Sequence, residues 1–560
     1  MEPDSTDLKK LFLEKKYSEI IKIIETKIRE KDKSSGLLNL LGVCKFLNNS
    51  SEETLNSSKN DFRKAYLKEK NTPNAFHALK NFINISMDLF DLEFRSGKTS
   101  SEKVFEEIFL YFNENKNYFE KNEGHAQSII RVFKRNLDLE NVIYYLKKVI
   151  DINGNNIDAI CAYIYFNSFR KDWDQKKFFE YSIILNRKLP LLPTSQLIDF
   201  KINKKKKINL AFFSADIRSK HSVTYFLRTV LMNYDKERFN VFLYLNNEKE
   251  DQTVNEFKNY VFKTTNIFNL KDVEAINVIR SDEIDIIIDL MGITSNHRLS
   301  LFKNRLAKKQ ILWCGYNNTS GIDQMDYLIA DKKSIYKDEE HFYSEKILYL
   351  DDIWNCHSGF PYKREFNEAP ISHKKYVTFG SFNNFRKIND DVINIWSSIL
   401  KKVSNAKLVL KPSDTASFSK ISEKFYRNGV LDSIIFLSHK KSFEEHLNDY
   451  KKIDIALDTF PYNGVTTSFE AIWMGVPVLT MKGNNFNSRG GESINKNLDL
   501  DELICRSDND YIKKAVSISE NINKIISLRK IIFDNALKSP LFDKKKFSKN
   551  FYDSLENIYN

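Results

Sequence analysis

The segment spanning residues 457–478 has the strongest chemical signature in the chain. It joins two apolar, strand-like runs through a glycine turn, with Gly464, Thr466 and Thr467 at the start of a predicted helix. Backbone N–H groups at a helix start lack partners within the helix, and the helix dipole places positive charge there. Together with two hydroxyls, these groups predict a phosphate-binding turn. Glu470 follows one helical turn after Thr467, so its carboxylate is expected on the face that opens into a cleft.

Two further residues carry side chains suited to a site that binds an anionic donor and transfers a group from it. Lys387 follows a strand-like run at 376–380, and its ammonium can stabilise the charge that develops on a leaving phosphate. His221 follows another such run at 210–213, and an imidazole with an ordinary pKa of about 6.5 can accept a proton near neutrality or orient an acceptor. Taken alone, such residues are more often solvated lysines and structural histidines.

These segments resemble the protein O-glycosyltransferase family of O-linked N-acetylglucosamine transferase and SPINDLY, most closely its bacterial SPINDLY-like branch. The family shows Asn-Gly-x-Thr-Thr, an acidic residue and then Trp-x-Gly-x-Pro, and residues 463–477 contain all of these. The resemblance covers about residues 208–505. Its further matches lie at residues 289–292, 313–316, 319–321, 325–327 and 343–345.

The resemblance implies the roles of a nucleotide-sugar site. It implies that Lys387 and His221 are catalytic, with Lys387 on the donor diphosphate and His221 in the cleft as a base or an acceptor-orienting group. His446 is implied to contact the base and Glu470 the ribose, although a helix-capping role is the structural alternative for Glu470. The residues implied to bind the donor are Asn384, Lys387, Lys441, His446, Gly464, Thr466, Thr467 and Glu470.

The chain also departs from the family pattern in places. Ile293 stands where relatives often carry histidine, and Val465 stands where the animal enzymes have histidine. Residues 306–309 replace a proline-rich approach to Trp313. These differences affect the choice of acceptor more than donor binding.

Residues 1–200 predict an all-α region of degenerate, tetratricopeptide-like (TPR-like) repeats. Apolar residues recur at helical spacing at 17–24 and 141–146, and no strand alternation is seen. Leu41 and Gly42 resemble part of such a repeat, but the repeat period is not kept. A plain helical bundle is the alternative to a short solenoid with a groove for a polypeptide.

From residue 208 onward, short apolar runs alternate with helical stretches, which predicts an α/β fold with parallel sheets. Two Rossmann-like lobes of the GT-B type are expected, with ligands beyond the carboxyl ends of the strands. The strand runs lie at 210–213, 241–245, 284–288 and 310–313, and then at 376–380, 407–410, 434–437, 453–457 and 476–480. The predicted domains are the all-α region 1–200, an acceptor-side lobe 206–355, a donor-side lobe 375–540 and a C-terminal helix 541–560 that packs back on the first lobe.

Composition narrows the class of protein. The chain has 560 residues, enough for two to four domains. Its five cysteines include no Cys-x-x-Cys pair, which argues against disulfides and a zinc site and favours a reducing cytoplasm. The net charge of +12 is spread over lysines interleaved with acids, so no nucleic-acid partner is expected. No signal peptide is recognised, and the apolar run at 284–291 is too short to span a membrane.

The leading hypothesis is a cytoplasmic, inverting glycosyltransferase that moves N-acetylglucosamine from its UDP donor to serine or threonine hydroxyls of proteins. No cofactor and no metal are expected, because Lys387 and the helix start already provide positive charge. The polypeptide acceptor is expected along the helical region. GDP-fucose is a rival donor, because the SPINDLY branch includes fucosyltransferases. The remaining alternatives are a non-catalytic nucleotide-sugar-binding scaffold and transfer to a glycan or a small acceptor.

Overall fold

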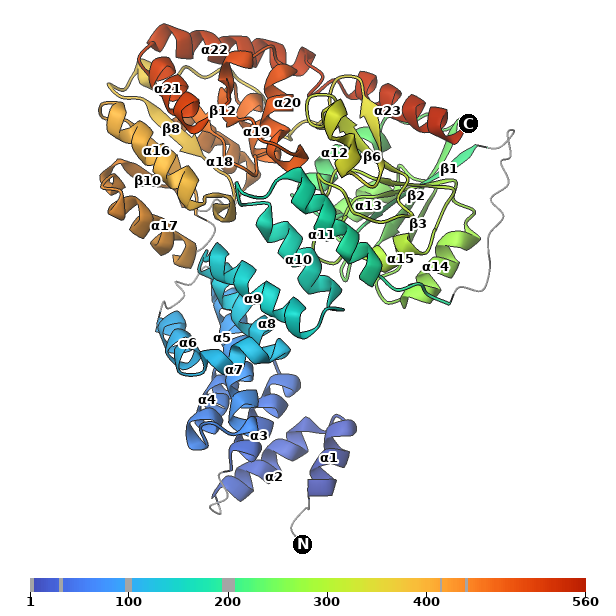
Figure 1. Cartoon of the computed structure of the whole chain (residues 1–560), viewed down its shortest axis with the longest axis vertical. Coiled ribbons are helices and arrows are strands. Elements are labelled where there is room, and N and C mark those ends of the chain that lie inside the picture. The colour runs from blue at the N-terminus through green and yellow to red at the C-terminus, as the bar shows by residue number, and fades with distance from the viewer. Residues whose placement is uncertain (1–4, 30–33, 96–102, 194–206, 413–414, 439–441) are drawn as a thin grey trace. The chain divides into compact units, whose positions relative to one another are not determined.

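The structure, a computed structural model, describes residues 5–29, 34–95, 103–193, 207–412, 415–438 and 442–560. The chain forms two compact units. They comprise Met1–Asn156 with Asp414–Lys420, and Ile157–Ser413 with Ile421–Asn560. The first unit is helical and the second contains two parallel sheets (Figure 1).

The first unit is built from helices that pack on their neighbours in the chain, as α3 does on α4 and α4 on α5. The approach of α3 to α4 is close, because a Cβ atom on Gly42 would lie 2.7 Å from the ring of Phe62. Side chains of Ser34 and Ser51 cap the starts of α3 and α4. The helices are α1 (Ser5–Leu13), α2 (Tyr17–Arg29), α3 (Ser35–Asn48), α4 (Glu52–Lys68), α5 (Pro73–Arg95), α6 (Lys103–Glu114), α7 (Lys116–Lys121), α8 (Glu123–Arg135) and α9 (Leu139–Ile152).

Two more helices, α10 (Ile157–Asn167) and α11 (Gln175–Lys188), belong to the second unit. Gln175 donates a hydrogen bond of 2.8 Å to the side chain of Asn318, and Lys303 donates one of 3.0 Å to Asn186. The predicted all-α region 1–200 therefore contains helices of both units.

The first lobe is a seven-stranded parallel sheet in the order β3-β2-β1-β4-β5-β6-β7. Its strands are β1 (Ile208–Ser214), β2 (Phe239–Leu245), β3 (Lys263–Asn266), β4 (Ile286–Asp289), β5 (Lys309–Leu312), β6 (Tyr327–Asp331) and β7 (Lys346–Leu350). The connecting helices are α12 (Ser222–Leu231), α13 (Gln252–Lys258), α14 (Asp272–Ser281), α15 (Leu299–Lys303) and the 3₁₀ helix η1 (Lys337–Phe342). All residues of β1 and β4 are buried, which is the expected pattern for central strands covered on both faces.

The second lobe is a six-stranded parallel sheet in the order β10-β9-β8-β11-β12-β13. Its strands are β8 (Thr378–Ser381), β9 (Lys407–Leu410), β10 (Ile434–Phe436), β11 (Ile455–Leu457), β12 (Val478–Met481) and β13 (Ile504–Cys505). Its helices include α16 (Asp390–Lys402), α18 (Phe443–Asn448), α19 (Thr466–Trp473), α20 (Gly490–Lys496), α21 (Asp508–Ser519) and α22 (Ile522–Asn535), with 3₁₀ helices η3 (Phe385–Lys387) and η6 (Phe486–Ser488). Helix α17 (Thr415–Arg427) belongs to the second unit from Ile421 onward. The strand order reverses between β8 and β11, which makes a topological switch point.

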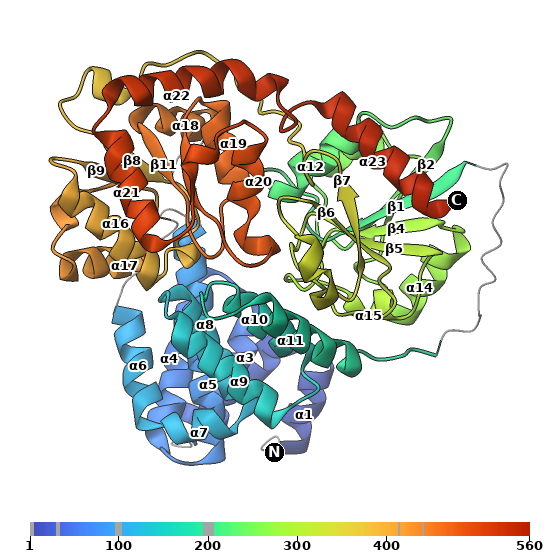
Figure 2. The ribbon, with the colours of Figure 1, turned by 45° about the horizontal axis from the view of Figure 1, so that its top comes forward.

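The last helix, α23 (Lys544–Tyr559), lies on the first lobe beside α12 (Figure 2). The hydroxyl of Tyr552 donates to the Val230 carbonyl at 3.0 Å, and Phe551 packs against Trp313 with ring centroids 4.8 Å apart.

Two further observations concern the cysteines and the helices. All five cysteines are free thiols. In the part of the chain that the structure describes, no helix combines the length and the apolar character needed to cross a membrane.

Candidate active site

The predicted site residues of the second lobe gather at its switch point. Strands β8 and β11 are adjacent, and the segments that follow them, residues 382–389 and 458–467, lie at the same edge of the sheet. The crevice at such an edge is where open α/β sheets bind ligands. Residues 458–467 are called the 458–467 turn below.

The 458–467 turn is built around a buried carboxylate. Asp458 accepts hydrogen bonds from the backbone N–H of Gly464 and from the hydroxyl of Thr480, both at 2.7 Å. Burial raises the pKa of Asp458 to about 6, against the effect of these donors. A Cβ atom on Gly464 would lie 2.4 Å from Thr467 Oγ1 and 2.7 Å from Asn383 Oδ1, so only glycine fits there.

Helix α19 begins at this turn with its first N–H groups uncapped by any side chain. Its N-cap residue is Val465, which has no side-chain acceptor to offer. The hydroxyl of Thr467 donates to Asn383 Oδ1 at 2.9 Å, and Thr466 is partly buried beside it. The helix start thus retains the unpaired donors that an anion requires.

Lys387 reaches the same turn from the other segment. Its ammonium donates to the Asn463 carbonyl at 2.7 Å and lies 4.5 Å from the centre of the Tyr462 ring. Removal from water lowers the pKa of Lys387 to about 8, and the carboxylate of Asp458 opposes this shift. The group is therefore mostly charged at neutral pH and is only partly solvated.

His446 and Glu470 contact one another directly, although 23 residues separate them in the chain. His446 Nε2 lies 3.0 Å from Glu470 Oε2, and the hydroxyl of Tyr450 donates to the same oxygen at 2.8 Å. The ammonium of Lys411 lies 2.8 Å from His446 Nδ1 and 3.1 Å from the Asp449 carboxylate. Because an ammonium can only donate, Nδ1 of His446 accepts its hydrogen bond. The N–H group is then on Nε2, which donates a hydrogen bond to the Glu470 carboxylate. The network fixes the orientation of the imidazole ring.

Two other residues, Asn384 and Lys441, were also predicted to contact the nucleotide-sugar donor. Asn384 is exposed, and its side chain accepts a hydrogen bond of 3.0 Å from the Arg386 backbone N–H at the start of η3. The preceding residue, Asn383, is the one that is buried and contacts Thr467. Lys441 lies outside the described residues.

The predicted catalytic histidine belongs to the first lobe. His221 is the N-cap residue of α12, and its Nε2 lies 3.5 Å from Asp216 Oδ1. Burial lowers the pKa of His221 below its ordinary value, while the Asp216 carboxylate opposes this effect. The imidazole is therefore neutral near pH 7, which is the form that accepts a proton. Its charged neighbours, Asp216 and Arg218, are both first-lobe residues, so the structure does not group it with Lys387.

The departures from the family pattern also have defined positions. Ile293 is buried in the first lobe and follows Gly292, whose φ of +54° suits glycine. Val465 is partly buried at the start of α19. An apolar side chain thus occupies both positions.

Sequence reasoning missed four residues of this site. Asp458 lies inside the segment first singled out, and its place directly after a buried strand was the available signal. Asn383, Lys411 and Tyr450 have no signal of their own, because strand pairing and loop geometry bring them to the site.

Comparison with known proteins supplies an independent view of the chain. A family model described as "Glycosyl transferase family 41" matches residues 188–358 and 370–551. The chain is 32% identical over 353 residues to the "Probable UDP-N-acetylglucosamine--peptide N-acetylglucosaminyltransferase SPINDLY" of Solanum lycopersicum, covering 60% of this chain and 37% of that protein. It is 26% identical over 372 residues to the similarly named SEC protein of Arabidopsis thaliana, covering 63% and 37%. The chain thus spans well under half the length of these curated relatives.

One solved structure matches nearly the whole chain. A mutant of the O-GlcNAc transferase of Thermobaculum terrenum superimposes with a TM-score of 0.79 and 22% sequence identity, covering 97% of this chain and 98% of that one. The match confirms the predicted fold, a helical region followed by two Rossmann-like lobes.

Proposed function

The chain belongs to glycosyl transferase family 41, and we propose that it transfers N-acetylglucosamine from UDP-N-acetylglucosamine to serine or threonine hydroxyls of proteins. The observation that carries the proposal is the contact of Lys387 with Asn463 of the 458–467 turn, the turn that leads into the uncapped start of α19 at the switch point of the second lobe. The names of the relatives from Solanum lycopersicum and Arabidopsis thaliana, each a probable UDP-N-acetylglucosamine--peptide N-acetylglucosaminyltransferase, support this choice of donor and acceptor.

In the proposed donor complex, the diphosphate lies against the start of α19. The first N–H groups of the helix and the Thr466 hydroxyl bind its oxygens, and the Lys387 ammonium binds it from the other side. The ribose lies toward Glu470 and the base toward His446. As the glycosidic bond breaks, negative charge grows on the departing UDP, so these donors stabilise the transition state more than the ground state.

The acceptor side of the proposed reaction involves the first lobe. A serine or threonine hydroxyl attacks the anomeric carbon, UDP departs from the opposite face, and the configuration inverts. The neutral imidazole of His221 takes the hydroxyl proton or orients the acceptor. The lowered pKa of His221 supports this role, because it keeps the base unprotonated near neutrality.

We further propose that the reaction needs no metal ion. Lys387 and the helix start place positive charge where a divalent ion would otherwise neutralise the diphosphate. Transfer should therefore persist in a chelator, and restoration of lost activity by magnesium or manganese would contradict this part of the proposal.

The helical unit is the proposed binding region for the polypeptide acceptor. It is a separate compact unit of helices packed on one another, which is the architecture that presents extended surfaces to polypeptides. The five free thiols support a reducing, cytoplasmic location.

Nucleotide release in the presence of protein acceptors tests the proposal. Release of UDP from UDP-N-acetylglucosamine that depends on the acceptor is the expected result. If GDP is released from GDP-fucose instead, the donor is GDP-fucose and not UDP-N-acetylglucosamine. Tight UDP binding without turnover of either donor would favour a non-catalytic nucleotide-sugar-binding scaffold.

A further inference from the structure

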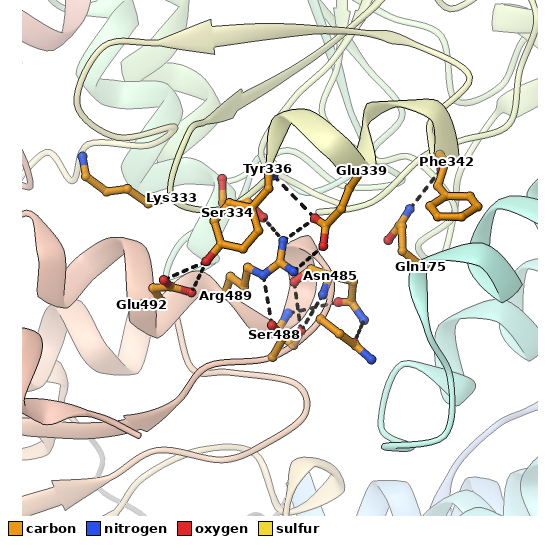
Figure 3. A network of polar contacts seen from close by, with 12 residues as sticks. Gln175, Lys333, Ser334, Tyr336, Glu339, Phe342, Asn485, Ser488, Arg489 and Glu492 are labelled. Carbon is orange, nitrogen blue, oxygen red and sulfur yellow. Dashed lines mark hydrogen bonds and ion pairs between the residues drawn. The ribbon is translucent and has the colours of Figure 1, made fainter. Parts of the chain in front are cut away.

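A network of polar contacts joins the first lobe to the second (Figure 3). On the first lobe it involves η1, which follows β6. On the second lobe it involves the segment between β12 and α20. Both segments follow the carboxyl end of a parallel strand, so the network lies where the two sheets present their ligand-binding edges.

Arg489 is the centre of this network and is only 3% exposed. Its guanidinium makes a bidentate ion pair with Glu339 of η1, with Nη2 at 2.6 Å from Oε1. The same group lies 4.0 Å from the centre of the Tyr336 ring. Its Nε donates to the Gly483 carbonyl at 3.0 Å, and Nη1 donates to the Ser334 carbonyl. One side chain thus binds both lobes through all of its nitrogens.

Two further contacts between the lobes involve α20, the helix that follows Arg489. The hydroxyl of Tyr336 donates to Glu492 at 2.9 Å, and the hydroxyl of Ser493 donates to Asp331 at 2.6 Å. Both carboxylates are buried. The helix is therefore held to the first lobe at successive residues.

The same helix also packs directly on the 458–467 turn. The N–H of Gly491 donates to Asn463 Oδ1 at 3.3 Å. A Cβ atom on Gly491 would lie 2.0 Å from Thr480 Oγ1 of β12 and 2.9 Å from Asp458 Oδ2 of the turn. The backbone of α20 therefore lies directly against these two side chains and leaves no room for a side chain at this position. Because Lys387 donates to the Asn463 carbonyl, the first lobe, Arg489, α20 and the turn form one continuous series of contacts.

We propose that the Glu339–Arg489 ion pair is a positioning device that sets the 458–467 turn, with the donor on it, against the acceptor side of the first lobe. The inference rests on the proposed function. The side chain of Glu339 binds Arg489 and also accepts a hydrogen bond of 3.5 Å from the Tyr336 backbone N–H at the start of η1. Of these two contacts, only the one with Arg489 crosses to the second lobe, so Glu339 acts on the turn through Arg489. Its loss should slow transfer while leaving the second lobe able to bind UDP.

The variant Glu339→Gln tests the proposal with little change of shape. It keeps the size and hydrogen-bonding oxygen of the side chain and removes the charge that balances a buried guanidinium, a loss that is costly for buried pairs. The matched control is Glu340→Gln, because Glu340 is the next residue of the same element and pairs with Lys337 of that element.

The expected result for Glu339→Gln is a kcat at least about tenfold lower with a UDP dissociation constant changed less than about twofold. Glu340→Gln should match the wild-type protein in both. A kcat for Glu339→Gln within twofold of the control would overturn the proposal. So would an equal loss in kcat and UDP affinity, because Glu339 would then act on the donor site itself rather than on its position.

A second readout does not depend on activity. Amide hydrogen exchange of residues 463–468 and 490–496 should become faster in Glu339→Gln and stay unchanged in Glu340→Gln, since the former loosens α20 from the first lobe. Unchanged exchange in both variants would overturn the proposal. If the wild-type protein transfers no sugar, the proposed function fails, whereas the exchange experiment still decides whether the ion pair positions the turn.

Discussion

At the scale of single residues, the site depends on a lysine that is held out of water against a turn. Lys387 is bound to the Asn463 carbonyl and faces the buried Asp458 carboxylate across the turn. Neither contact satisfies the ammonium as a phosphate would, because a diphosphate offers several charged oxygens at once. The lysine is thus placed before the donor arrives.

Replacing this lysine tests its role. Lys387→Ala should lower kcat about 10- to 150-fold, the equivalent of one hydrogen bond to a charged group. The melting curve should stay close to that of the wild-type protein, and Lys401→Ala on the exposed surface of α16 is the control. If Lys387→Ala retains most of the activity, Lys387 has no catalytic role.

The depressed pKa of Lys387 predicts a pH dependence for donor binding. The ammonium that binds the diphosphate is fully present below the pKa of about 8 and is lost as the pH rises through it. UDP affinity should therefore fall above pH 8, by at most about tenfold per pH unit. Titration calorimetry across this range measures it. Lys387→Arg should abolish the fall, because a guanidinium stays charged, and a fall that persists in this variant would point to another group.

The hydroxyl of Thr466 has a separate test. Thr466→Val keeps the shape of the side chain and removes one donor from the helix start, so UDP affinity should fall about 2- to 10-fold. Thr467 is less informative, since its hydroxyl also holds Asn383. Thr265→Val on β3 of the first lobe is the control, and equal UDP affinity in the two variants would count against the phosphate site.

The sequence predicts several residues of this site but not the contacts between them. It named His446 and Glu470 separately, whereas their direct contact arises only when α18 and α19 pack at the same edge of the sheet. It named Asn384, which is exposed, and did not single out its buried neighbour Asn383, because neither residue type nor periodicity tells which side chain of an irregular turn points inward.

At the scale of elements, the two glycines that open α20 explain how the helix fits against the turn. Gly491 has no space for a side chain beside Thr480 and Asp458.

Most strand runs predicted from the sequence correspond to strands of the sheets, because buried parallel strands are continuous apolar runs. Strands β3, β6, β7 and β13 were not predicted. Strand β3 is polar, β13 has only two residues, and β6 and β7 are joined by a 3₁₀ helix that breaks the strand–helix alternation.

Adding one methyl group tests this packing. Gly491→Ala should destabilise the protein by about 1–3 kcal/mol through overpacking. It should also weaken UDP binding, because the displaced atoms belong to Asp458 of the 458–467 turn and to Thr480, whose hydroxyl donates to Asp458. Thermal melting and calorimetry measure the two effects. Gly36→Ala is the control, since the nearest atom to its added Cβ would be 3.6 Å away. Unaltered stability and affinity in Gly491→Ala would contradict the described packing.

At the scale of the whole molecule, the chain combines a helical unit with a unit of two lobes. The sequence predicts both parts, but helical periodicity says only that a segment is helical and not what it packs on. Helices α10 and α11 illustrate this, because they continue the helical series and yet bind the first lobe through contacts such as Gln175 with Asn318.

The central claim, transfer of N-acetylglucosamine to protein hydroxyls, is tested most directly by the product. Protein acceptors incubated with the chain and UDP-N-acetylglucosamine should gain the mass of an N-acetylhexosamine, and fragmentation should place the sugar on serine or threonine. Lys387→Ala should give little product under the same conditions. Acceptors that keep their mass with this donor, or gain a deoxyhexose only when GDP-fucose is supplied, would contradict the account.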